Sequence, residues 1–206
     1  MITPNKHQQA SDFLRAIDSD WAQLIASVGA CTLDAEIEPE LSPYEALVQA
    51  VAYQQLHGKA AATIFGRFKN HFGDFPSPEQ LVAAQFDDLR ACGFSGRKIE
   101  TIQGIANGVI SGLVPSREAA ESLSDDEIIA RLVSLKGIGQ WTVEMLLMFT
   151  MQRMDILPVG DFAVLEGYKR LKKLAIAPKP KQLAEIGQAW SPHRTVASWY
   201  LWRVPK

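Results

Sequence analysis

The sequence predicts an all-α protein of about ten short helices. Helix start signals recur along the chain, and apolar residues repeat with helical spacing. Strict alternation of apolar and polar residues over five or more positions, the signature of a half-buried strand, is hard to find. With 206 residues, 47 % of them hydrophobic and 21 % charged, we expect one compact globular unit or two small lobes that share the chain.

In chain order, the first half offers one faint strand candidate and two clear helix starts. Thr32–Ile37 is the strand candidate, and we assign it to a loop. Ser42-Pro43-Tyr44-Glu45 combines a capping serine, a proline at the first helical position and a glutamate three residues after the cap, which predicts a helix through Leu56. Ser77-Pro78-Glu79-Gln80 repeats this signal. The glycines at 104, 108 and 112 predict breaks between short segments.

The second half continues the helical pattern. Ser124-Asp125-Asp126-Glu127 predicts a helix through Val133, and an apolar helix is expected from about Thr142 to Gln152. A further helix is expected from Asp161 through Arg170, and Pro178-Lys179-Pro180-Lys181 predicts an extended connection before the last helical region.

Composition narrows the classes of function. Cys31 and Cys92 are too few for a disulfide framework, a four-thiolate zinc site or an iron–sulfur cluster, and we expect both to be small buried side chains. No secretory signal or membrane span is evident, so the expected location is the cytoplasm. The net charge of −2 hides an asymmetry: residues 1–135 hold 10 basic and 18 acidic residues, and residues 136–206 hold 11 and 5. A local basic face for nucleic acid is therefore compatible with the acidic total.

The most informative stretch runs from Leu135 to Thr142 and reads as helix, tight turn, helix. Gly137 and Gly139 permit a sharp turn and leave backbone amides pointing outward at a helix N-terminus, an arrangement that suits a phosphate. An ordinary glycine-containing helix connection is the alternative for so short a motif.

In its flanking context this stretch resembles the hairpin of the helix-hairpin-helix DNA glycosylase superfamily, L-P-G-I/V-G-x-x-T-A, from which it departs only at Lys136 and Val143. The blocks in the same order cover residues 43–202, and the nearest likeness is to the 3-methyladenine-DNA glycosylase II branch. The further matching blocks are Tyr53-Gln54-Gln55-Leu56-His57-Gly58-Lys59-Ala60-Ala61, Cys92-Gly93-Phe94-Ser95-Gly96-Arg97-Lys98, Leu157-Pro158-Val159-Gly160-Asp161-Phe162 and Trp190-Ser191-Pro192-His193-Arg194-Thr195 through Trp202.

The resemblance implies two helical lobes, one of residues 43–155 with the hairpin and one of residues 1–42 plus 156–206, without the N-terminal β domain of some branch members. Trp141 stands where lyase-competent relatives place a Schiff-base lysine, so the implied enzyme is monofunctional and hydrolyses the glycosidic bond without nicking the strand. Lys136 replaces the usual proline and adds a cation beside the phosphate site.

Asp161 is the expected catalytic carboxylate by this resemblance, and its position at the start of a helix also predicts an N-cap; the two roles can coexist. Glycosylases extrude the target nucleotide into a pocket and stack it there. The resemblance assigns Trp141, Phe162 and Trp202 to the pocket walls, with weaker support for Tyr53, although such an aromatic taken singly is more often a core residue than a pocket wall. Gln55 and Leu56 fall in the segment that fills the vacated base stack.

The expected partner is double-stranded DNA with alkylated bases, bound by a monomer. The resemblance implies that the amides of Gly137, Gly139 and Thr142 hold a phosphate. A monovalent cation, Na⁺ or K⁺, would bridge to the main-chain carbonyls of Val133, Leu135 and Ile138, and no cofactor is expected for the chemistry. Three alternatives remain: a non-catalytic helix-hairpin-helix DNA-binding module, a bifunctional lyase, which Trp141 disfavours, and a small helical interaction protein.

Overall fold

The structure, a computed structural model, describes residues 6–35 and 41–205. These residues form thirteen α-helices, two 3-10 helices and one π-helix, and none of them lies in a strand. The all-α prediction is confirmed, with more helices than the ten expected. The expected loop at Thr32–Ile37 contains a 3-10 turn over Leu33–Ala35, and Glu36 and Ile37 lie outside the described residues.

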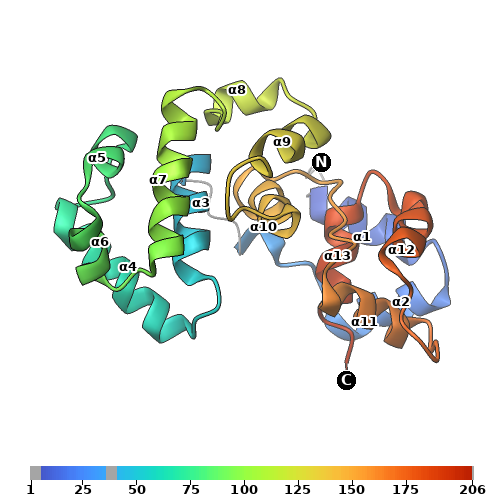
Figure 1. The fold of residues 1–206 in the computed structure, drawn as a ribbon. Helices are drawn as coiled ribbons and strands as arrows, with labels where there is room; N and C mark the ends of the chain where they lie inside the picture. Colours follow the sequence, from blue (N-terminus) through green and yellow to red (C-terminus); the bar gives the residue numbers. More distant parts are fainter. Residues whose placement is uncertain (1–5, 36–40, 206) are drawn as a thin grey trace. The chain divides into compact units, whose positions relative to one another are not determined.

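The chain divides into two compact units (Figure 1). The central unit is Pro39–Leu146, and the terminal unit combines Met1–Glu38 with Leu147–Lys206. The chain passes from the first to the second in a π-helix over Leu146–Thr150 that follows a short α-helix. The prediction of a single apolar α-helix over 142–152 is therefore wrong, because the second half of this segment has the wider turns of a π-helix. After it, the amide of Arg153 donates to the carbonyl of Leu147 at 2.9 Å.

The central unit contains the helices whose start signals the sequence showed. Ser42, Ser77 and Ser124 each cap a helix and complete a capping box with the residue three positions later. The helices are α3 (Pro43–Tyr53), α4 (Gly58–Phe72), α5 (Pro78–Ala83), α6 (Phe86–Cys92), α7 (Gly96–Ile110), α8 (Arg117–Glu121), α9 (Asp125–Leu132) and α10 (Gln140–Met145).

Helix α7 is the axis of the central unit and packs against α3, α5 and α6 (Figure 1). Ile99, Ile102 and Ile105 on it are fully buried. Contrary to expectation, α7 continues through Gly104 and Gly108. A Cβ at Gly108 would lie 3.0 Å from Val114 Cγ2 and 3.3 Å from Leu135 Cδ2, so this glycine permits close packing inside a helix and does not end it.

The terminal unit buries its own core around Trp21, Trp190 and Tyr200, and the two indoles meet edge to face with ring centroids 5.4 Å apart. A Cβ at Gly167 would lie 2.1 Å from the carbonyl oxygen of Leu201, so the third and last of its α-helices have backbones in close contact. The helices of this unit are α1 (Lys6–Arg15), α2 (Ser19–Val28), α11 (Phe162–Leu171), α12 (Pro180–Ile186) and α13 (Arg194–Leu201), with a 3-10 helix over Gly187–Trp190.

The structure also tests the expectations for the 178–181 connection and for the two cysteines. The extended connection at 178–181 is only half right, because Pro180 is the first residue of α12, a position at which proline's missing N–H costs nothing. Both cysteines are free; Cys92 is buried as expected, and Cys31 is half-buried. Among the described residues no helix is long and apolar enough to span a membrane.

Asp155 joins the segment before α11 to the start of α13. Its carboxylate accepts two hydrogen bonds from the Arg194 guanidinium, at 2.7 and 2.9 Å, and one from Ser191 Oγ at 2.7 Å. Burial raises the pKa of Asp155, but the hydrogen bonds from Arg194 and Ser191 outweigh burial and leave the pKa below its usual 3.8.

Because the folded-state pKa is depressed, the ionised carboxylate stabilises the protein above the unfolded-state pKa, and this contribution is lost as pH falls from about 4 through the folded-state value. We expect Asp155→Asn to lower the free energy of unfolding at pH 7 by about 1–2 kcal/mol after allowance for solvent screening. Urea unfolding at pH 7 and pH 3 measures the free energy of unfolding of the variant and of the wild type. The difference between the two proteins should be smaller at pH 3 than at pH 7. Asp12→Asn, which removes an exposed pair with Arg15, is the control and should change stability little.

Candidate functional site

The predicted helix-turn-helix is present in the central unit. Helix α9 ends at its C-cap Val133, and α10 begins after its N-cap Gly139. Between them Gly137 has φ +87°, the left-handed region that favours glycine, and the amide of Ile138 donates to the carbonyl of Leu135 at 3.1 Å. The hairpin over 133–139 is therefore a tight turn built on one obligatory glycine.

The two hairpin glycines have different reasons to be glycine. A Cβ at Gly137 would lie 2.3 Å from Oγ1 of Thr101 on α7, so this position is closed by both backbone conformation and packing. Gly139 has φ −96°, which any residue adopts, and a Cβ there would meet nothing within 4 Å. Backbone conformation and packing therefore explain why residue 137 is a glycine. At Gly139 the open space leaves room for a ligand that approaches the backbone.

The main-chain polar groups of the hairpin fit the expected ligands to different degrees. The amide of Thr142, expected to hold a phosphate, already donates to the carbonyl of Gly139 at 3.0 Å, whereas Gly137 and Gly139 precede the helix.

The carbonyl of Leu135 accepts one hydrogen bond and has a second lone pair. Val133 and Leu135 lie at or just after the C-terminal end of α9, where carbonyls lack helical partners and can take a hard monovalent cation, whereas Ile138 directly precedes the N-cap of α10. The described residues contain no cluster of His, Cys, Asp and Glu side chains that could hold a metal ion.

Lys136 points to an acidic partner on α7. Its ammonium lies 2.6 Å from Glu100 Oε2, and both side chains are more than half exposed. Lys136 lowers the pKa of the Glu100 carboxyl through this hydrogen bond and its charge. An ion pair so exposed contributes little to stability, which leaves the lysine able to exchange its partner for a phosphate.

The segment expected to fill a vacated base stack forms an exposed loop after α3. Helix α3 ends at Tyr53 and not at Leu56 as expected, because Lys98 Nζ donates to the carbonyls of Ala52 and Gln54, at 2.8 Å each, where the next helical turn would begin. Gln55 then takes φ +57°, and Leu56 is 41 % exposed. A shallow pocket of about 220 Å³ lies against this 54–56 loop, with Ile64, Gly93, Phe94 and Ser95 among its other lining residues.

Asp161 is the N-cap of α11 in the terminal unit, as predicted. Its Oδ1 accepts the amide of Val164 at 2.9 Å and the indole Nε1–H of Trp202 at 3.1 Å. Trp202 lies at the C-cap of α13 and stacks on Phe149, with ring centroids 6.0 Å apart and an interplanar angle of 18°. The carboxylate is half-buried, oriented by two neutral donors and located at the positive end of a helix dipole.

Three of the four aromatics assigned to a base pocket are exposed. An exposed large aromatic face is available for stacking. Trp141, Phe162 and Tyr53 are 51 %, 77 % and 38 % exposed. Trp202 differs from them, because Phe149 covers its ring and its N–H is committed to Asp161. The structure divides the set between the units: Tyr53 and Trp141 belong to the central unit, and Phe162 and Trp202 to the terminal unit.

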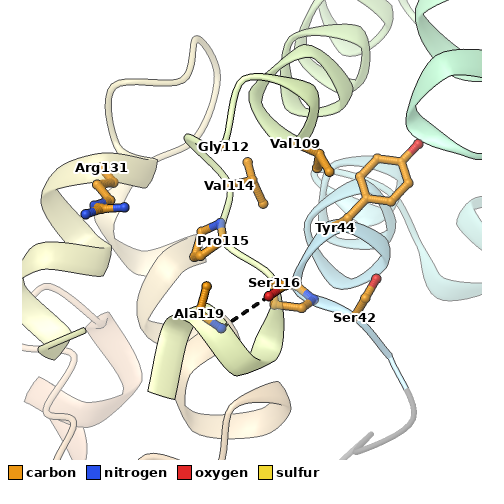
Figure 2. Close-up of a pocket in the computed structure, with 10 residues that line it drawn as sticks. Ser42, Tyr44, Val109, Gly112, Val114, Pro115, Ser116, Ala119 and Arg131 are labelled. Carbon is orange, nitrogen blue, oxygen red and sulfur yellow. Dashed lines mark hydrogen bonds between the residues drawn. The ribbon is translucent and has the colours of Figure 1, made fainter. Parts of the chain in front are cut away.

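A larger pocket of the central unit, about 400 Å³, contains none of the predicted site residues (Figure 2). Val109, Val114 and Pro115 supply apolar surface, Arg131 lies at one side, and Ser116 Oγ accepts the amide of Ala119 at 3.2 Å. None of its lining residues is a carboxylate or a histidine, the side chains that most often carry acid–base chemistry.

Sequence reasoning missed two side chains that shape the site. Lys98 belongs to the 92–98 block that resembles the family, and only its position in that block could have suggested a role for it. Phe149 lies in an apolar run and carries no signal that separates it from a core residue.

A glycine-containing helical hairpin and a carboxylate at a helix N-terminus are both features of DNA base excision proteins. The chain belongs to the HhH-GPD superfamily of base excision DNA repair proteins, whose model matches residues 48–193. It is 44 % identical to DNA-3-methyladenine glycosylase 1 of Schizosaccharomyces pombe over 200 residues, which cover 96 % of this chain and 87 % of that one.

Two solved structures agree with this grouping. The S. pombe 3-methyladenine DNA glycosylase (Mag1) in complex with abasic DNA matches with a TM-score of 0.82 at 44 % identity, and the match covers 95 % of each chain. A DNA-3-methyladenine glycosidase from Bacillus halodurans matches with a TM-score of 0.84 at 36 % identity over 94 % of this chain and 88 % of that one. The superfamily, its fold and the 3-methyladenine glycosylase branch, all inferred from the motifs, are confirmed.

Proposed function

We propose that the protein is a monofunctional DNA-3-methyladenine glycosylase that removes alkylated purines, of the 3-methyladenine and 7-methylguanine type, in base excision repair. The observation that carries the proposal is Asp161, a carboxylate held at the N-terminus of α11 by Val164 and Trp202. Close relatives that carry this activity in their names, one of them with abasic DNA in its structure, support it. The enzyme acts on double-stranded DNA as a monomer.

Hydrolysis breaks the bond between the base nitrogen and C1′, forms a bond from C1′ to a water oxygen, and releases one proton of that water to the solvent. Positive charge builds on the sugar as the base leaves with the bonding electrons, and the Asp161 carboxylate stabilises that charge and orients the water. A 3- or 7-alkylated purine already bears a positive charge and leaves as a neutral base. A strong general acid is therefore not required, and one carboxylate suffices.

The exposed aromatics supply the stacking surfaces for an extruded base. Trp141 and Phe162 offer broad faces to an electron-poor alkylpurine, whose charge gains from cation–π attraction. Trp202 orients the carboxylate through its N–H and also borders the base, and Tyr53 adds a further ring. Gln55 and Leu56 enter the gap that the base leaves.

The hairpin holds the DNA backbone. The amides at Gly137 and Gly139 bind a phosphate, with Thr142 at the first turn of α10, and Lys136 adds a cation once it leaves Glu100. When bound, a Na⁺ or K⁺ ion on the carbonyls of Val133, Leu135 and Ile138 would add positive charge beside that phosphate.

We expect borohydride to trap no covalent complex between the protein and DNA. An imine needs an amine at C1′, and Trp141 occupies the position of the lyase lysine. The measurement is denaturing electrophoresis of a lesion duplex incubated with enzyme and borohydride, with a known bifunctional glycosylase as the positive control. An adduct that forms in proportion to base release would show that another amine, such as that of Lys136, acts as nucleophile.

A base-release assay tests the proposed function itself. Duplexes that contain 3-methyladenine, 7-methylguanine, ethenoadenine or hypoxanthine are incubated with the protein, and free base and abasic strands are quantified. Release of at least the cationic alkylpurines supports the proposal. DNA binding without release of any base would identify the chain as a non-catalytic helix-hairpin-helix module.

A further inference from the structure

The first two turns of α7 contact two separate segments of the central unit to which the proposed function gives DNA contacts. Lys98 reaches the 54–56 loop, and Glu100 and Thr101 reach the hairpin at Lys136 and Gly137. All of these residues lie within one compact unit, so these contacts are internal to it.

Lys98 holds the loop at its entrance. The Nζ atom donates to the carbonyls of Ala52 and Gln54 at 2.8 Å each, on either side of the last residue of α3. These carbonyls are at the negative end of the α3 dipole, where a cation is favoured. Partial burial lowers the pKa of the Lys98 ammonium, which is half-buried against the loop.

The backbone conformation of Gln55 explains why the loop needs the hydrogen bonds from Lys98. Gln55 has φ +57°, a left-handed conformation that is strained for a residue with a Cβ. Its side chain and that of Leu56 are exposed, and the amide of Leu56 donates only back to Tyr53, at 3.3 Å. Among the described residues, the contacts from Lys98 are therefore the tertiary hydrogen bonds that secure this strained turn.

At the other end of the same two turns, α7 defines the position of the hairpin. Thr101 occupies the space in which a side chain at Gly137 would lie, and Glu100 pairs with Lys136. Lys98 and Thr101 are three residues apart and so lie on neighbouring positions of one helix face. The spacing between the loop and the hairpin is thus determined by the rigid geometry of a helix.

We propose that Lys98 is a positioning residue: it holds the 54–56 loop in the conformation that fills the vacated base stack, and α7 keeps this loop in register with the phosphate-binding hairpin. The proposal rests on the proposed function. Lys98 touches neither the base nor the sugar and acts through Gln55 and Leu56.

The test compares excision of 7-methylguanine paired with cytosine and of the same lesion in a single-base bulge, where the base is already poorly stacked. Lys98→Met keeps the length of the side chain and removes the donors, Lys98→Arg keeps donors, and Lys69→Met alters an exposed lysine of α4 as the control. We expect Lys98→Met to lower the ratio of paired to bulged excision rates at least about tenfold, and Lys98→Arg and Lys69→Met to stay within about threefold of the wild type.

Because the ratio is measured on one preparation, a partly unfolded sample does not change it, and a purely structural role for Lys98 would leave it unaltered. An unchanged ratio in Lys98→Met overturns the proposal. So does an additive effect in the double variant Lys98→Met with Leu56→Ala, since a residue that acts through the loop loses its effect when the loop's apolar side chain is gone.

A second measurement needs no base release. A duplex with a tetrahydrofuran abasic analogue and 2-aminopurine beside it reports insertion of the loop by fluorescence. Wild type, Lys98→Arg and Lys69→Met should give the same change on binding, and Lys98→Met less than half of it. If the wild type releases no base, the proposed function fails, and the fluorescence arm alone still decides the role of Lys98.

Discussion

Asp161→Asn is expected to lower the rate of base excision by about 10²-fold or more while the protein stays folded and binds DNA normally. Asparagine caps helices as well as aspartate does, and its side-chain oxygen can still accept the Val164 amide and the Trp202 indole N–H. The substitution therefore removes the charge that stabilises the sugar cation and little else.

Single-turnover excision of 7-methylguanine, together with the melting temperature and affinity for an abasic duplex, measures the effect. Asp155→Asn is the matched control, because it neutralises another half-buried carboxylate of the terminal unit that is committed to Arg194. It should cost stability and leave excision by the folded enzyme intact. A folded Asp161→Asn protein with near-wild-type excision would contradict the assignment of the catalytic residue.

Gly137→Ala is expected to destabilise the protein by about 2–4 kcal/mol, because alanine is strained at φ +87° and its Cβ would overlap Thr101. Affinity for DNA should fall with it, since the hairpin must shift away from α7. Gly139→Ala should cost about 1 kcal/mol or less, because the position is open and its backbone conformation is ordinary. It should nevertheless weaken binding to lesion-free and lesion-bearing duplex alike.

Thermal unfolding and salt-dependent affinity, measured on both variants, separate packing from phosphate binding. If a phosphate approaches the backbone at Gly139, Gly139→Ala should reduce the slope of log affinity against log salt by roughly one. A stable Gly139→Ala protein that binds DNA as the wild type does would leave the hairpin as only a helix connection. Gly137→Ala cannot decide this question, because its instability would lower affinity under either interpretation.

The sequence by itself determined the helical class and most helix starts. Ser42, Ser77, Ser124 and Asp161 cap helices through hydrogen bonds within three residues of the cap, and such local chemistry is legible without a fold. The hairpin motif and Asp161 were also legible, because their family blocks are contiguous. Helix ends were harder to predict from the sequence. Helix α3 stops at Tyr53 because of a lysine 45 residues further along the chain.

Only the tertiary structure decided the roles that depend on distant neighbours. Gly137 and Gly139 look equivalent in a G-x-G pattern, yet Thr101 of α7 closes one and leaves the other open. Trp202 looks like a stacking aromatic, but its N–H and its ring are engaged by Asp161 and Phe149. Lys98 has no local signal at all, because its partners are main-chain carbonyls, which every residue possesses. The specificity of such contacts lies in the packing of helices, and a linear pattern does not contain it.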